Sequence, residues 1–158
     1  MWLDKWFKKR DDEPPPPEER PQILAVAMSV DDRVSLGWVG KEHHWKIRFT
    51  QSPREALTLA SQRHFDVILC DRTQPGYPWG EVMYSLAACS PQSCILLVSP
   101  ASDDGLWQSV LHHGGYDVLI RPLKESATIR TIQAALRFMS PENAASEGCQ
   151  YSQRDCDA

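Results

Sequence analysis

Four short stretches of the chain consist of consecutive apolar residues, and each is bordered by polar or turn-forming residues. They span residues 23–28, 67–70, 94–98 and 118–120. Continuous apolar runs of this kind are typical of strands that are buried on both faces, as in a parallel sheet. Residues 45–49 differ, because apolar and polar positions alternate there. One half-exposed face predicts an edge strand.

Amphipathic segments with helical spacing separate these runs. The sequence Ser52-Pro53-Arg54-Glu55 is a capping box with proline at the first helical position. A weaker helix is expected over about residues 31–41, because Gly37 lies inside it. Three further stripes are Val82, Met83, Leu86 and Ala87; Trp107, Val110 and Leu111; and Ile129, Ile132, Leu136 and Met139. Strands and helices alternate five times, which predicts an α/β, doubly wound five-stranded parallel sheet with helices on both faces.

Composition divides the 158 residues into three parts. Residues 1–21 open with aromatic and basic residues and continue into a Pro-rich linker, which we expect to be a stiff, extended spacer. Residues 22–140 hold the predicted domain, and residues 141–158 are polar and without period, which indicates a disordered tail. In the first part, one side of a possible short helix would carry Trp2, Leu3, Trp6 and Phe7. That side would be a membrane-surface anchor, a docking peptide or a frayed aromatic start.

Charge and cysteine usage exclude several classes of protein. A net charge of -4 argues against a nucleic-acid binder held by phosphate contacts. The sequence has no run of about 20 apolar residues and no secretory signal. Five cysteines without a close CxxC pair are expected as free thiols in the cytoplasm.

Polar side chains with different chemistry follow three of the predicted strands. Asp71 follows residues 67–70, Ser99 follows residues 94–98, and Arg121 follows residues 118–120. Function in open α/β sheets collects at the carboxyl ends of the strands. Each residue alone is better explained as a solvated strand end, but their joint occurrence predicts a site.

Three segments carry these residues, in the order FDVILCDRTQPG, ILLVSP and GGYDVLIRPL. They resemble the corresponding segments of response-regulator receiver domains, and the resemblance covers most of residues 23–139. It implies a flavodoxin-like strand order of 2-1-3-4-5. It also implies that Asp71 accepts a phosphoryl group from a histidine kinase, with Mg²⁺ bound, and that Ser99 and Arg121 contact that group. A cis peptide bond before Pro122 is expected on the same basis.

The chain departs from the receiver pattern at the metal site. Ala27 and Met28 stand where the family has two acidic residues, and neither can ligate Mg²⁺. Asp31 and Asp32 would replace that pair only if the first strand slid along the chain. Otherwise both are first-turn residues of the helix, favoured by its dipole. The resemblance thus implies Mg²⁺, and the lost acidic pair argues against it.

Two further departures affect switching. Arg121 replaces a lysine, and its planar guanidinium can grip Asp71 bidentately without a phosphate. Val118 replaces the aromatic residue that moves when the family is activated.

Two hypotheses follow, neither of them an enzyme. The first is a single-domain response regulator in phosphorelay signalling, phosphorylated at Asp71 by a histidine kinase or phosphotransfer protein and acting on a downstream protein. The second is a pseudo-receiver that serves as a binding or adaptor module independently of phosphorylation. A weaker third makes the aromatic N-terminus the functional element.

Overall fold

The computed structural model of the chain describes residues 15–139. The aromatic N-terminal residues 1–14 and the predicted tail after residue 139 lie outside the described residues, so the predictions about them stand as predictions. The described part of the Pro-rich linker is not extended as expected. It forms a turn in which the amide of Glu19 donates to the carbonyl of Pro16 over 2.9 Å. Pro17 has the backbone angle that the second position of such a turn requires.

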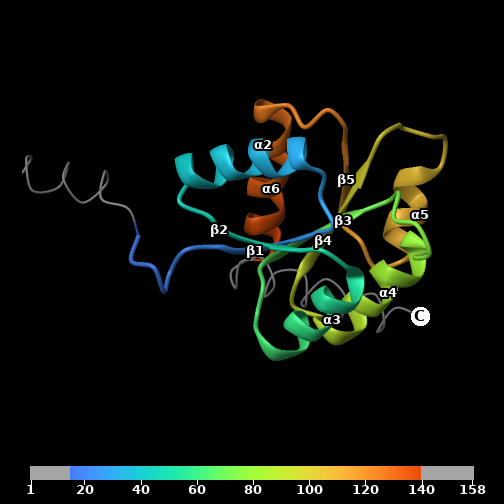
Figure 1. Cartoon of the computed structure of the whole chain (residues 1–158), viewed down its shortest axis with the longest axis horizontal. Coiled ribbons are helices and arrows are strands. Elements are labelled where there is room, and N and C mark those ends of the chain that lie inside the picture. Colours follow the sequence, from blue (N-terminus) through green and yellow to red (C-terminus); the bar gives the residue numbers. More distant parts are fainter. Residues whose placement is uncertain (1–14, 140–158) are drawn as a thin grey trace, which may run out of the picture.

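Five parallel strands form one sheet in the order β2-β1-β3-β4-β5 (Figure 1). Both the doubly wound class and the strand order are as predicted. The edge position of β2 matches its alternating pattern. The strands are β1 (Gln22–Val26), β2 (Lys46–Thr50), β3 (Val67–Asp71), β4 (Cys94–Ser99) and β5 (Asp117–Ile120).

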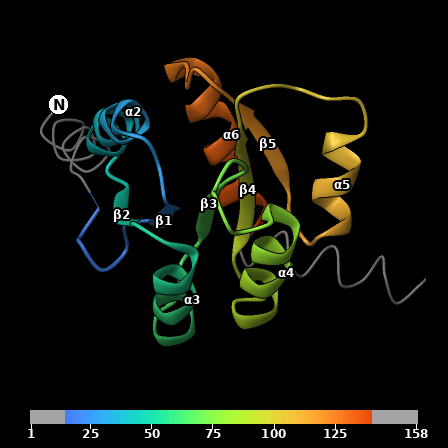
Figure 2. The same cartoon turned by 45° about the vertical axis from the view of Figure 1, so that its right-hand side comes forward.

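Five helices cover the two faces of the sheet. They are α2 (Val30–Glu42), α3 (Pro53–Gln62), α4 (Trp79–Cys89), α5 (Leu106–His112) and α6 (Glu125–Phe138). Figures 1 and 2 show α2 and α6 on one side and α3, α4 and α5 on the other. Alternate strand residues therefore join different cores, with Leu69 on the side of α2 and α6 and Ile68 on the opposite side. No helix within residues 15–139 has the length and apolar character needed to cross a bilayer.

The capping box predicted for α3 is present. Ser52 accepts a hydrogen bond from the amide of Glu55 over 3.2 Å, and Pro53 begins the helix. The Glu55 carboxylate reaches back to the amide of Gln51 over 3.1 Å. The Ser52 contact satisfies an amide donor that the first turn of a helix leaves free, whereas the Glu55 carboxylate binds the residue before the cap and not the amide of Ser52 itself.

The first strand is shorter than its apolar run suggested. It ends at Val26, because Ala27 takes a left-handed backbone with a φ of 54°. The amide of Ala27 still donates to the carbonyl of Thr50 over 2.8 Å. Ser29 then caps α2 by accepting from the amide of Asp32. The chain has not slid, so Ala27 and Met28 occupy the turn after the strand.

The stripe predicted for α5 is wrong in part. Val110 is fully buried, but Trp107 and Leu111 are 54% and 43% exposed. Leu106, which the pattern missed, is buried instead. The helix begins directly after Gly105, and its residues four apart, Leu106 and Val110, face the sheet.

Candidate functional site

Asp71 ends the central strand β3, at the edge where the carboxyl ends of all five strands meet. It pairs in register with Val98, and Ser99 pairs with Ile120, the residue before Arg121. This register brings Asp71 and Arg121 to one place, as the sequence predicted. The Asp71 side chain is only 10% exposed.

Both oxygens of the Asp71 carboxylate accept hydrogen bonds. Arg121 grips it bidentately, with Nη1 3.1 Å from Oδ1 and Nη2 2.8 Å from Oδ2. The amide and the hydroxyl of Thr73 donate to Oδ1 over 2.9 and 3.0 Å. The bidentate pair was predicted. The contribution of Thr73 was missed. An aspartate side chain commonly accepts a hydrogen bond from the residue two positions later, in an Asx turn.

A second carboxylate, from Asp32 in the first turn of α2, binds the same guanidinium. Its Oδ2 accepts from Nε of Arg121 over 2.9 Å and lies 2.9 Å from Nη2. Its side chain is 5% exposed. The predicted place of Asp32 in the helix was correct, but its role was missed. A signal was present, because Asp32 lies four and seven residues before Leu36 and Val39 of the buried stripe.

Arg121 is thus a half-buried cation between two buried anions. Burial lowers the pKa of its guanidinium, but the hydrogen bonds and charges of Asp71 and Asp32 more than offset this. The net effect raises the pKa above its ordinary value, so Arg121 stays charged. The peptide bond between Arg121 and Pro122 is cis, as predicted.

Ser99 lies beside this cluster but makes no hydrogen bond to Asp71. Its hydroxyl is fully buried and donates to the carbonyl of Ala101 over 2.7 Å. It also accepts from Nη1 of Arg72 over 3.2 Å, and Arg72 in turn pairs with Asp103. Sequence reasoning missed Arg72, whose position directly after Asp71 at the strand end could have indicated it.

Val118 is half-buried in β5 and packs against the core on the side of α3, α4 and α5. It lines a hollow with Trp107 and Ile120. A valine side chain has few rotamers, so it offers no large inward swing at this position.

The residues at this edge do not fit Mg²⁺. Ala27 and Met28 have no oxygen in their side chains, and Met28 is buried. The carboxylates of Asp32 and Asp71 are both engaged by Arg121. Magnesium requires near-octahedral oxygen ligands. Within residues 15–139, no group of three or more His, Cys, Asp or Glu residues could hold a metal ion.

The strand order β2-β1-β3-β4-β5, with helices on both faces, is that of the receiver-domain fold. Solved structures of this class are similar. Chemotaxis protein CheY4 of Vibrio cholerae aligns with a TM-score of 0.68 and 22% identity, covering 74% of this chain and 99% of that one. A two-component response regulator from Clostridium difficile gives 0.70 and 20%, covering 77% and 99%. A CheY-like receiver domain from Methanospirillum hungatei gives 0.68 and 16%, covering 78% and 99%. No family model and no curated protein matches the sequence.

Proposed function

We propose that this chain is a receiver-type module of two-component signalling that binds its protein partners without being phosphorylated. The observation that carries the proposal is the bidentate contact between Arg121 and both carboxylate oxygens of Asp71. A receiver aspartate must attack phosphorus with one of those oxygens. Here each oxygen already accepts from a guanidinium.

Freeing Asp71 for that attack is costly. Removing one partner of a buried ion pair typically costs about 3–5 kcal/mol, which sets the scale for a carboxylate left without its cation. Even about 3 kcal/mol added to a barrier slows a reaction by roughly 100-fold. A bound metal ion could supply compensating positive charge, but it would need ligands other than Ala27 and Met28. The site therefore supports a fixed ion-pair network better than a nucleophile.

In this role the chain has no catalytic activity of its own and acts in the cytoplasm. Its partners are a histidine kinase or phosphotransfer protein and a downstream protein, and nucleic acid is not among them. The net charge of -4 supports the last point.

A second function, that of a phosphorylated regulator, is favoured by two features of the same site. Asp71 and Ser99 end neighbouring strands, and Arg121 has a second anchor in Asp32. Nε of Arg121 could stay on Asp32 while its terminal nitrogens moved from the carboxylate to a phosphoryl group. The phosphorus–nitrogen bond of a phosphohistidine would break as Oδ of Asp71 formed the new bond.

Intact-mass measurement after incubation with acetyl phosphate and Mg²⁺ separates the two functions. The pseudo-receiver gives no phosphoryl adduct, and Asp71→Asn behaves identically. The variant Arg121→Lys, which keeps one charge but loses the fork, should gain an adduct. A labile adduct on the wild-type chain that disappears in Asp71→Asn would establish the second function instead.

A further inference from the structure

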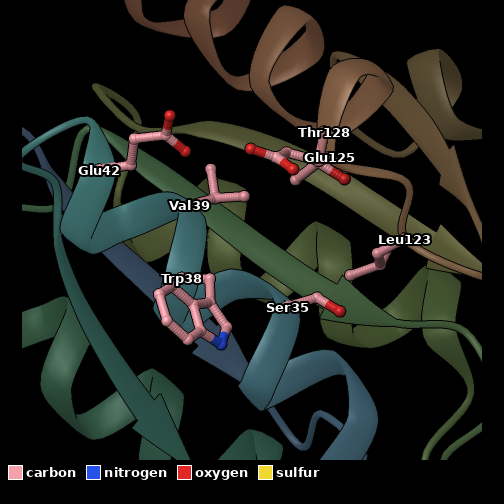
Figure 3. A pocket seen from close by; sticks show the side chains of 7 residues that line it. All are labelled: Ser35, Trp38, Val39, Glu42, Leu123, Glu125 and Thr128. Atoms are coloured by element: carbon pink, nitrogen blue, oxygen red, sulfur yellow. The ribbon is translucent and has the colours of Figure 1, made fainter.

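A groove lies between α2 and the start of α6, away from Asp71. Its volume is about 260 Å³, slightly below the range of about 300–1,000 Å³ for small-molecule pockets. Figure 3 shows side chains from both elements facing it. The lining residues are Ser35, Trp38, Val39, Glu42, Leu123, Glu125 and Thr128. A groove of this size suits individual side chains of a peptide.

The exposed side of α2 next to this groove is apolar. Val30, Val34 and Trp38 follow one another at four-residue spacing and are 75%, 57% and 71% exposed. Leu36 and Val39 are buried on the other side of the same helix. A surface helix normally has one apolar stripe, which faces the core. No element within residues 15–139 covers this second apolar stripe of α2.

Polar groups at the groove also lack partners. Glu42 and Glu125 are exposed carboxylates, and neither forms an ion pair with a described residue. The Thr128 hydroxyl is buried and has no hydrogen-bond partner within residues 15–139. Buried hydroxyls are ordinarily hydrogen-bonded. The groove thus combines an apolar wall, two anions and an unused polar group.

We infer that this groove binds the N-terminal segment of the same chain. Residues 1–10 read MWLDKWFKKR, which places Trp2 and Trp6 four residues apart and supplies three lysines and one arginine against a single aspartate. The two tryptophans are apolar and have the same four-residue spacing as Val34 and Trp38 in the exposed stripe of α2. The cations match Glu42 and Glu125. This inference does not depend on the role of Asp71.

The point where the segment joins the fold makes the contact reachable. The amide of Lys46 donates to the carbonyl of Pro21 over 2.8 Å, and Trp45 donates to Gly40 near the end of α2. The N-terminal chain therefore leaves the domain beside that end of the helix. Residues 10–15, which precede the turn at Pro16, span at most about 20 Å when extended. The 13 residues of α2 also span about 20 Å.

Backbone and indole NMR spectra of the full chain test the inference. The substitution Trp2→Ser/Trp6→Ser leaves the sequence of residues 15–139 unchanged. We expect it to shift the Trp38 indole signal and the amides of Ser35 and Glu125. Changes confined to residues 1–21 would overturn the inference.

Charge substitutions provide the matched control. Glu42→Lys/Glu125→Lys should reproduce the loss of docking in the signals of residues 2–8, while Glu81→Lys on the exposed surface of α4 should not. Equal effects of both variants would count against the groove. Shifts that depend on protein concentration would also contradict the inference, since they would indicate a second copy's segment.

Discussion

Arg121 connects the end of β5, the end of β3 and the first turn of α2. Its side chain is 18% exposed, and the Asp32 and Asp71 side chains are 5% and 10% exposed. Two carboxylates at this degree of burial are tolerated only with a compensating cation. The charge of Arg121 is therefore a structural requirement of the site.

Replacing Arg121 with alanine should lower the free energy of unfolding by about 3–5 kcal/mol, because it leaves two buried carboxylates without a cation. Urea denaturation followed by circular dichroism measures this loss. Arg54→Ala, an exposed arginine on α3, should change stability by less than about 0.5 kcal/mol. A loss for Arg121→Ala as small as that of the control would show that the network contributes little.

Cys70 precedes Asp71 in the fully buried strand β3 and gives a pH dependence with a definite sign. Burial, and secondly the charge of Asp71, raise the pKa of this thiol from 9.0 to about 12. Only the unfolded chain then loses the proton between these pH values, so stability should fall as pH rises through that window. The expected contribution is about 1.4 kcal/mol per pH unit.

Urea denaturation at pH 8, 10 and 11 measures this slope against Cys70→Ala, with pH 8 as the reference below the window. The variant should be less stable at pH 8 but should lose stability less steeply with pH, because its unfolded state lacks one ionising thiol. Parallel pH profiles for the two proteins would show that the Cys70 thiol ionises equally in both states.

At the scale of elements, local chemistry set some boundaries and the surrounding structure set others. The capping box at Ser52 fixed the start of α3 where the sequence indicated. The apolar run through Met28 did not fix the end of β1, because Ala27 turns the chain there. An apolar turn buried under a helix has the same composition as a buried strand, so hydrophobicity alone cannot separate them.

Substituting Ser52 with alanine should cost about 1 kcal/mol of unfolding free energy, because the Glu55 amide loses its acceptor. Thermal unfolding monitored by circular dichroism checks this. Ser126→Ala, at an exposed position inside α6, should be neutral or slightly stabilising. A stability change at Ser52 no larger than at Ser126 would mean that the cap is replaced by water.

At the scale of the whole molecule, the sequence predicted the parallel sheet from its apolar runs and the strand order from the family resemblance. It also predicted that Asp71 and Arg121 meet, because both follow strands whose ends meet. The resemblance, with arginine in place of lysine, indicated that the two can form a bidentate pair. The sequence did not predict the contact with Asp32, which is 89 residues from Arg121. That contact depends on the rotation of α2 about its own axis, which packing of the complete domain determines.

The helix α2 relates the two sites. Its buried side supplies Asp32 to the ion-pair network, and its exposed side carries Trp38 beside the groove (Figure 3). A partner or segment that binds α2 from outside therefore contacts the element that positions Arg121.

The central claim is that Arg121 holds Asp71 permanently. The NMR signal of the Arg121 Nη1–H group, which donates to Oδ1 of Asp71, tests it most directly. The signal is first assigned by its response to Asp71→Asn, which removes the charge of its acceptor. Beryllofluoride, an analogue of a phosphoryl group, is then added with Mg²⁺ to the wild-type chain. We predict an unchanged signal. A shift that is lost in Asp71→Asn would show that the guanidinium releases the carboxylate, and would contradict the account.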